Sequence, residues 1–207
     1  MLNIRTLSLG SYQTNCYIVS APGSTRCVLI DTGDRPESVL AYLTQEGLSP
    51  DAILLTHGHF DHVGAVAALV KATACEVWIH EGDYTQKSTP MTDYLYPLHD
   101  KSFCPFQFCE EGQEITAAGL TFRTIETPGH TWGSVCYVCQ DTMFCGDTLF
   151  AGSCGRTDLP GGDPATMADT LERLGQLDAD FRIFPGHGES STLRHEQRTN
   201  PYLRGHL

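Results

Sequence analysis

The sequence lacks three features that would narrow its function at once: a long apolar run, an excess of basic charge and a paired cysteine framework. No apolar run approaches the ~20 residues that a membrane-spanning helix needs. The first ten residues, MLNIRTLSLG, show no basic segment followed by a long apolar one, as an export signal would. We therefore expect no membrane partner and no export.

Basic residues are outnumbered by acidic ones. The chain has 13 Lys and Arg against 25 Asp and Glu, which gives a net charge of −12. Binding to nucleic acids relies on the attraction of Lys and Arg for phosphate, with release of counterions. No basic run interrupts the acidic composition, so we expect no nucleic-acid partner.

The nine cysteines are odd in number and scattered, mostly within apolar segments. A secreted disulfide framework usually has an even number of patterned cysteines. We expect a reducing cytoplasm, in which cysteine serves as a small apolar side chain. Cys136 and Cys139 have the spacing of half a zinc knuckle, but a strand would point them to opposite faces and no second pair follows. We predict that both pack in the core.

A length of 207 residues and an apolar fraction of 41% suit a single domain over residues 1–207 with a sizeable core. Short β-branched or aromatic runs bounded by Gly, Pro or Asp predict strands at 4–7, 16–19, 27–31, 52–56, 76–80, 120–126, 135–139, 142–145 and 182–184. Apolar spacing and end signals predict helices at 36–47, 63–71, 164–175 and 192–199. The order of these elements favours two sheets inside and helices outside.

Residues 86–112 show neither pattern and are rich in aromatic residues and proline. A loop of that length is usually functional. We expect an irregular segment that flanks the substrate.

The segment ILLTHGHFDHVGA contains four side chains able to bind a metal, on the loop between a predicted strand and a predicted helix. His57 and His59 are two residues apart, so an extended backbone points both to the same side. Asp61 and His62 follow at the start of the helix. Imidazole and carboxylate are the ligands of zinc and similar divalent metals. Two such pairs on one tight loop suggest two neighbouring ions.

Further ligands occur in the same setting elsewhere. His130 in TPGHTWGS, Asp147 in MFCGDTLF and His187 in IFPGHGES each follow a predicted strand and are preceded by glycine. Glycine there lets the backbone turn sharply and approach a site closely. We expect these side chains to join the first cluster. The remaining histidines have no such setting and are expected to be ordinary: His80, His99, His195 and His206.

Together these segments resemble the five-part signature of the metallo-β-lactamase superfamily, with VLIDTG (28–33) resembling its first motif. The resemblance extends from residue 15 to about residue 190. It implies an α/β fold, an αββα four-layer sandwich of two mixed β-sheets flanked by helices. The ligand set that it implies is His57, His59 and His130 for one divalent ion, Asp61, His62 and His187 for a second, and Asp147 bridging both.

In that resemblance Asp61 and Asp147 are the candidate catalytic carboxylates, and Asp31 orients a ligand from behind. Two neighbouring ions would turn water into hydroxide near neutral pH and polarise a carbonyl group. Ligands without cysteine suit zinc, which we expect first, and also iron or manganese. Cys145 and Cys154 lie near the site in sequence but are not expected to act as nucleophiles.

TNCYIV near the start and LFAGSCGRTDLPGGD after Asp147 resemble the glyoxalase II-like branch, the hydroxyacylglutathione hydrolases, and especially its short bacterial members. This implies hydrolysis of a thioester such as S-lactoylglutathione, with Arg156 contacting the glutathione. Two departures leave the thiol carrier open. Residues 188–207 are all that follow His187, whereas full-length glyoxalase II has a C-terminal helical domain, and Asp158 stands where an aromatic residue would be expected.

The main alternative is a mononuclear iron persulfide dioxygenase, a class that resembles this chain in fold and in its GRTD loop. There His57, His130 and Asp147 would form the two-histidine, one-carboxylate face that binds Fe(II). Hydrolysis of another ester or lactone is also open. A non-enzymatic metal-binding protein would be expected to have lost a ligand, and none is lost. The sequence leaves the oligomeric state open.

Overall fold

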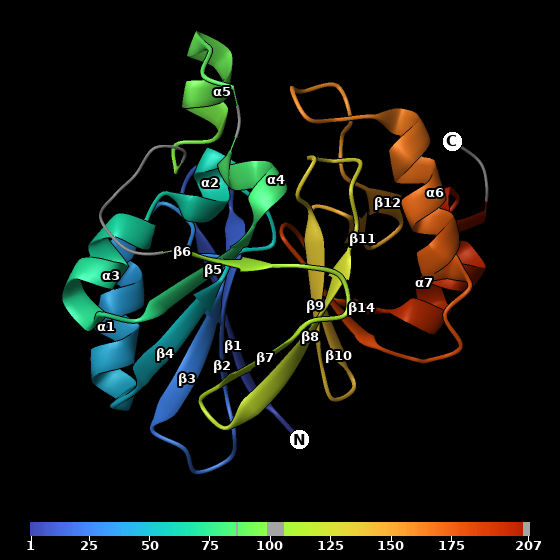
Figure 1. Ribbon diagram of the computed structural model, residues 1–207. Coiled ribbons are helices and arrows are strands. Elements are labelled where there is room, and N and C mark those ends of the chain that lie inside the picture. Colours follow the sequence, from blue (N-terminus) through green and yellow to red (C-terminus); the bar gives the residue numbers. More distant parts are fainter. Residues whose placement is uncertain (86, 99–105, 205–207) are drawn as a thin grey trace.

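Two six-stranded β-sheets packed face to face form the centre of the computed structural model, which describes residues 1–85, 87–98 and 106–204 (Figure 1). The first sheet contains, in spatial order, β1 (Asn3–Leu9), β2 (Thr14–Ser20), β3 (Arg26–Ile30), β4 (Ser49–Leu54), β5 (Glu76–His80) and β6 (Phe106–Cys109). The second contains β14 (Ser191–Thr192), β13 (Arg182–Pro185), β10 (Thr142–Gly146), β9 (Val135–Cys139), β8 (Leu120–Glu126) and β7 (Glu114–Ala117). A small two-stranded sheet joins β11 (Leu149–Phe150) to β12 (Ser153–Cys154).

Both large sheets are mixed. In the first, β1, β2 and β3 pair antiparallel, whereas β3 to β6 pair parallel through crossover connections. In the second, β10 and β13 form the one parallel pair among the described strands. The predicted pair of mixed sheets is confirmed.

Helices cover the outer face of each sheet, α1 and α3 on the first and α6 and α7 on the second (Figure 1). The helices are α1 (Pro36–Glu46), α2 (Phe60–Val63), α3 (Val66–Thr73), α4 (Glu81–Tyr84), α5 (Pro90–Leu95), α6 (Pro164–Gly175), α7 (Leu193–Thr199) and the 3-10 turn η1 (Tyr202–Arg204). This confirms the αββα arrangement. Across the described ranges no helix combines the length and the apolar character needed to cross a membrane.

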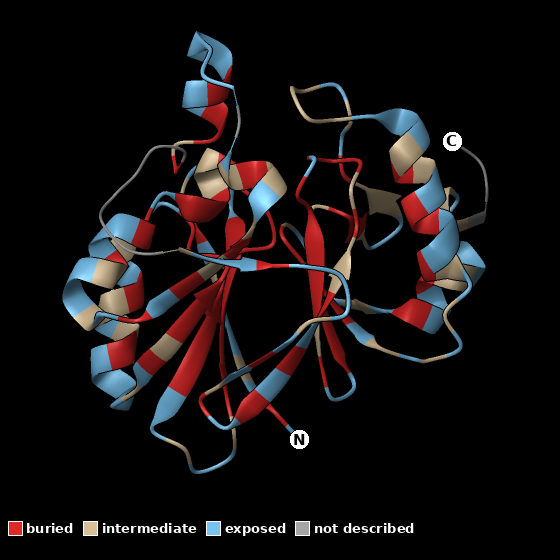
Figure 2. Cartoon of the chain, viewed as in Figure 1, coloured by how far each residue is buried: buried red, intermediate tan, exposed pale blue. Residues whose placement is uncertain are grey.

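Three separate apolar cores fill the spaces between the four layers. Figure 2 shows buried residues along the strands and on parts of the helices. Tyr17 and Phe144, from opposite sheets, belong to the core between the sheets. Leu29 and Leu69 belong to the core under α1 and α3. The third core lies under α6 and α7. Because strand side chains alternate between faces, each sheet buries one face in the central core and one beneath its helices.

Local sequence signals match the helix ends. Helix α1 begins at Pro36, and Gly47 closes it in the left-handed conformation at φ 63°. The side chain of Asp163 accepts a hydrogen bond from the backbone N–H of Thr166 and caps α6. Cys136 and Cys139 lie in different cores, on opposite faces of β9, as predicted.

The prediction of an irregular segment at 86–112 was wrong for two parts of it. Helix α5 occupies Pro90–Leu95, because Thr89 and Thr92 form a reciprocal capping box and Pro90 suits the first helical position. Strand β6 pairs with the edge strand β5, a long-range contact that local sequence does not encode. Residues 86 and 99–105, including His99, lie outside the described residues, as does His206.

The helix predicted at 63–71 corresponds to α3, which begins three residues later, and the short helix α2 before it was not predicted. The chain turns through α2 and then begins α3 at Val66. Strands β7 and β14 were not predicted, since each is short and sits at a sheet edge.

Candidate metal centre

The predicted ligands converge at one end of the two sheets, because each follows the end of a central strand. His57 and His59 follow β4, His130 follows β8, and Asp147 follows β10. His187 lies just after β13, which runs parallel to β10. Strands from both sheets therefore place their terminal loops around a single point.

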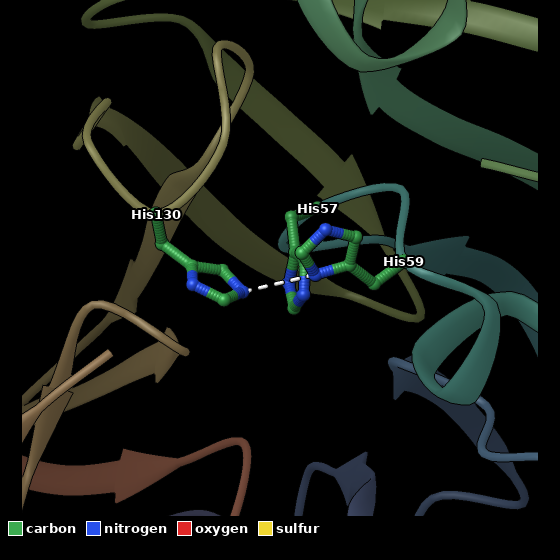
Figure 3. A group of neighbouring side chains, drawn as sticks. All are labelled: His57, His59 and His130. Atoms are coloured by element: carbon green, nitrogen blue, oxygen red, sulfur yellow. Dashed lines mark hydrogen bonds between the residues drawn. The ribbon is translucent and has the colours of Figure 1, made fainter. Parts of the chain in front are cut away.

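We call His57, His59 and His130 the imidazole group. Their rings face one another, with His57 and His59 from one loop and His130 from another (Figure 3). Nε2 of His130 lies 3.0 Å from Nδ1 of His59. One ring nitrogen from each residue lies within 4.8 Å of the others. All three side chains are buried.

We call Asp61, His62 and His187 the mixed group. Nε2 of His187 lies 3.3 Å from Nε2 of His62 and 3.3 Å from Oδ2 of Asp61. This group is more open, since the side chain of His187 is 28% exposed and that of Asp61 13%. Its donors also lie within 4.8 Å of one another.

The carboxylate of Asp147 lies between the two groups. Its Oδ2 is 3.6 Å from Nε2 of His130 in the imidazole group and 3.5 Å from Nε2 of His187 in the mixed group. Its Oδ1 is 3.4 Å from Nε2 of His62. One carboxylate thus reaches donors on both sides.

Glycine at two strand ends permits this closeness. A Cβ on Gly186 would lie 2.2 Å from Oδ1 of Asp147 and 2.7 Å from the ring of His62. Gly146 adopts a positive φ of 48°, and a Cβ there would lie 2.3 Å from Oγ1 of Thr56. The residue before His187 and the residue before Asp147 therefore have no room for a side chain.

Asp31 lies behind the mixed group. Its Oδ2 is 2.8 Å from Nδ1 of His62 and also accepts a hydrogen bond from the hydroxyl of Thr56 at 2.8 Å. Its Oδ1 accepts the backbone N–H of Thr56. Asp31 therefore contacts a predicted ligand at the ring nitrogen that faces away from the centre.

A second buried carboxylate, Asp83, was not singled out from the sequence. Its Oδ2 accepts hydrogen bonds from the backbone N–H of Gly58, at 2.8 Å, and from the hydroxyl of Thr131, at 2.7 Å. Its Oδ1 accepts the N–H of Gly133 at 2.7 Å. Burial raises the pKa of this carboxyl, although these hydrogen bonds oppose the shift. Asp83 ties the loop of His57 and His59 to the loop of His130.

The turn between β1 and β2 holds the mixed group from the other side. The hydroxyl of Thr14 donates to Oδ2 of Asp61 at 3.0 Å. The amide of Asn15 donates to the carbonyl oxygens of Pro185 and Gly188, on either side of His187. These contacts explain why the TNCYIV segment lies next to the site.

The two groups differ in their electrostatics. Burial and the neighbouring imidazoles lower the pKa of His57 well below its ordinary value and that of His59 to about 3. Both rings are therefore neutral at physiological pH. A neutral imidazole is the form that binds a metal.

The mixed group is charged. Burial lowers the pKa of His187, but hydrogen bonds to Asp147 and Asp61 outweigh burial and raise it to about 10. Burial raises the pKa of Asp147, but the charge of His62 and the hydrogen bond with His187 outweigh burial and lower it to about 2. Burial raises the pKa of Asp61, but the hydrogen bond with His187 and the charge of His62 outweigh burial and bring it well below its ordinary range. Carboxylates that stay ionised can bind cations.

The donor set fits divalent metal ions. Nε2 of His57 is buried and has no hydrogen-bond partner among the described residues. Nδ1 of His130 faces the carbonyl oxygen of Arg156 at 2.7 Å, and Nδ1 of His187 faces that of Tyr12 at 3.0 Å. A ring that donates its Nδ1–H to a carbonyl presents Nε2 to a metal, which displaces any proton held there. In both rings Nε2 faces other donors of the centre.

A cavity of about 560 Å³ opens beside the mixed group. Asp61, Asp147 and His187 reach its surface, as do Cys154 and Arg156. The guanidinium of Arg156 forms two hydrogen bonds with the carboxylate of Asp158, at 2.6 and 2.8 Å. The predicted substrate-binding residue therefore faces the expected cavity, but it is already paired.

The histidines expected to be ordinary lie elsewhere, as far as the structure describes them. Nδ1 of His80 accepts the N–H of Gly82, and its Nε2 lies 3.2 Å from Glu126. His195 is exposed on α7. Neither belongs to a group of potential metal donors.

Comparison with known sequences gives a consistent family. The profile of the metallo-beta-lactamase superfamily matches residues 9–187. An uncharacterised protein of Mycobacterium leprae is 35% identical over 95% of this chain and 96% of its own length. The hydroxyacylglutathione hydrolase GloC of Haemophilus influenzae is 32% identical over 98% of both chains. The hydroxyacylglutathione hydrolase of Aeromonas salmonicida is 39% identical over 91% of this chain, which spans 67% of that protein.

Solved structures agree on the fold. The B3 metallo-beta-lactamase BLEG-1 superposes with a TM-score of 0.85 at 32% identity, over 98% of this chain and all of that one. TTHA1623, solved in a di-iron-bound form, gives a TM-score of 0.82 at 41% identity, over 96% of this chain and 99% of that one. ETHE1 from Myxococcus xanthus gives 0.80 at 27% identity, over 98% of this chain and 85% of that one.

Proposed function

The chain belongs to the metallo-beta-lactamase superfamily, and we propose that it hydrolyses a small-molecule thioester with the help of two divalent ions. The observation that carries this proposal is the position of Asp147 between two complete donor groups. A site for one ion would not need both groups. In this proposal His57, His59 and His130 would hold one ion, Asp61, His62 and His187 would hold the other, and Asp147 would contribute its carboxylate to both.

When bound at such a site, divalent ions lower the pKa of coordinated water and polarise a carbonyl oxygen. The protein's own groups prepare for that chemistry. His57 and His59 are neutral and buried, so these two rings need lose no proton before they bind. Asp61 and Asp147 remain ionised and hold negative charge beside the cavity.

Asp31 and Asp83 act on the ligands from outside the centre. Asp31 faces Nδ1 of His62 and fixes the orientation of that ring. Asp83 fixes the spacing of the two loops that form the imidazole group. A thiolate is a good leaving group, so the reaction does not need a strong general acid. Neither Cys145, which is buried, nor Cys154 is required as a nucleophile.

The thioester substrate is supported by the relatives named hydroxyacylglutathione hydrolases. The test is steady-state hydrolysis, by protein loaded with zinc, iron or manganese, of S-D-lactoylglutathione and of thioesters of the uncharged thiol N-acetylcysteamine. We expect metal-dependent cleavage of at least one class with kcat/KM in the enzymatic range of ~10⁴–10⁸ M⁻¹s⁻¹. Failure to cleave any thioester with metal bound would overturn the proposal.

A mononuclear iron persulfide dioxygenase is the second candidate. His130 and Asp147 approach to 3.6 Å next to His57, which would supply two imidazoles and a carboxylate to one iron. The likeness to ETHE1 from Myxococcus xanthus is compatible with it. Oxygen uptake by the iron-loaded protein on glutathione persulfide would favour this candidate over hydrolysis.

We also propose a cytoplasmic site of action, without nucleic-acid or membrane partners. The net charge of −12 supports the exclusion of a nucleic-acid partner. Eight cysteines in the described ranges are free, which suits a reducing compartment. Fractionation of expressing cells, with the protein found outside the cytoplasm, would contradict this.

A further inference from the structure

The wall of the cavity facing the metal centre is largely apolar. The apolar and aromatic residues that line it are Tyr12, Phe60, Tyr94, Leu95, Phe150 and Leu159. They surround the same opening that Asp61, Asp147 and His187 reach. A substrate whose scissile bond lies at the donors must therefore place neighbouring atoms against this wall.

Three aromatic rings of the wall form a continuous row. The rings of Tyr12 and Phe60 meet edge to face with centroids 5.2 Å apart, and those of Phe60 and Tyr94 are 5.0 Å apart. Tyr12 is 57% exposed and Tyr94 is 60% exposed. Aromatic side chains gain free energy when such surface is covered, so this row is suited to bind an apolar group.

The cavity wall beyond the metal donors offers few cationic groups to an anionic ligand. Among the cavity-lining residues that the structure describes, Arg156 supplies the one guanidinium, and there is no lysine. Both oxygens of Asp158 already accept hydrogen bonds from Arg156. Glutathione carries two carboxylates at neutral pH, and the one guanidinium of the described wall is already paired with Asp158.

Building on the proposed thioester hydrolysis, we propose that this pocket selects thioesters whose acyl group is uncharged and apolar, of the size of an aryl ring or a medium-length alkyl chain. The volume of about 560 Å³ lies in the usual range for small-molecule sites. In the reaction a water oxygen bonds to the acyl carbon and the carbon–sulfur bond breaks. The products are an apolar carboxylic acid and the free thiol, so no oxidant or reductant is consumed.

The experiment varies the acyl group and the carrier separately. Acetyl, D-lactoyl, phenylacetyl and octanoyl thioesters of N-acetylcysteamine are compared first, and the same acyl groups on glutathione second. We expect kcat/KM to rise by about tenfold or more from acetyl to phenylacetyl on either carrier, since an apolar group in a fitted pocket is worth 10–200-fold per methylene-sized increment. Transfer of the phenylacetyl group to glutathione should bring no gain.

The two proposals fail in different ways. If no thioester is cleaved with metal bound, the proposed hydrolysis itself fails. If thioesters are cleaved but lactoyl or acetyl substrates equal or exceed phenylacetyl and octanoyl, the hydrolysis stands and the apolar selection is overturned. A large preference for glutathione over N-acetylcysteamine at a fixed acyl group would also overturn it.

Variants of the wall give a second readout. Tyr94→Ala and Phe60→Ala should lower the phenylacetyl-to-acetyl ratio of kcat/KM by about tenfold. Phe108→Ala is the matched control, because Phe108 is an exposed aromatic residue on β6 outside the cavity lining. An unchanged ratio in both wall variants, with the metal content of the wild type, would contradict the proposal.

Binding to the metal-free protein separates recognition from catalysis. Calorimetry with the benzyl and methyl thioethers of N-acetylcysteamine, which cannot be hydrolysed, should show tighter binding of the benzyl compound. Tyr94→Ala should reduce that difference and Phe108→Ala should not. Equal affinity of the two thioethers for the wild-type protein would count against the apolar pocket.

Discussion

The imidazole group contains three histidines and the mixed group contains two, yet the two groups differ in burial and in charge. The imidazole group is buried, and the rings of His57 and His59 are neutral. The mixed group is partly open, and its Asp61 and His187 are charged. The first group therefore offers two neutral rings in advance, whereas the second faces the cavity where a substrate arrives.

Each group has its own buried carboxylate. Asp83 joins the loops of the imidazole group and contacts backbone N–H groups, whereas Asp31 contacts a ligand ring of the mixed group directly. Asp83 therefore acts on the imidazole group through its loops, whereas Asp31 contacts the ring of His62 and also the backbone N–H of Thr56, beside His57. Asp147 lies within 3.6 Å of donors in both groups.

Removal of Asp147 should have the largest effect, because it breaks both groups together. In Asp147→Ala, as in His59→Ala, we expect hydrolysis to fall by roughly 10³-fold or more, since loss of a ligand costs several kcal/mol of transition-state stabilisation. Rates and bound metal per chain are measured on protein whose circular dichroism matches the wild type. Asp169→Ala, an exposed carboxylate on α6, is the control. A variant that keeps more than about a tenth of the wild-type rate would exclude the two-ion mechanism.

Substitution of either supporting carboxylate should weaken metal binding in one group more than in the other. Asp83→Asn places an amide N–H₂ against backbone N–H donors and should weaken metal binding in the imidazole group by about 10–100-fold. Asp31→Asn should weaken the mixed group by a similar factor through His62. Stepwise titration with Co²⁺, followed by its absorption, shows which step weakens. Identical changes in both variants would mean that the groups are not supported separately.

The stability of the metal-free protein should depend on pH through both groups, with a smaller effect than the substitutions above. The pKa of His59 is lowered to about 3 in the folded protein, from about 6.5 in the unfolded chain. Between about pH 6.5 and about pH 3 the unfolded state therefore binds more protons, and the free energy of unfolding falls as the pH falls. The pKa of His187 is raised to about 10. Its contribution is complete below about pH 6.5 and is lost as pH rises towards 10.

We therefore expect these histidines to give the metal-free protein a stability maximum near pH 6.5 in urea denaturation. His59→Gln should flatten the acidic side of the curve, and His187→Gln the alkaline side. A curve with no loss of stability on either side would contradict the opposite pKa shifts of His59 and His187.

Much of this arrangement follows from local sequence. The alternation of apolar residues and the positions of Pro36, Gly47 and Asp163 define most strands and helices. The glycine-preceded ligands at strand ends indicate a shared site, because strands of one sheet end at common edges. The structure brings all seven predicted ligands together.

What sequence could not reveal depends on contacts between distant segments. Asp83 is a single carboxylate whose partners Gly58 and Gly133 lie 25 and 50 positions away. The aromatic row joins Tyr12 to Tyr94 through Phe60. Strand β6 forms because its backbone pairs with the edge strand β5. None of these carries a local pattern that would distinguish it from ordinary surface or loop residues.

The most direct test of the central claim is a crystal structure of the metal-loaded protein with anomalous diffraction recorded at the absorption edge of the bound metal. Two anomalous peaks are predicted, one within bonding distance of His57, His59 and His130 and one within bonding distance of Asp61, His62 and His187, with Asp147 contacting both. A single peak held by His57, His130 and Asp147 at full metal loading would contradict the two-ion account and favour the mononuclear iron alternative.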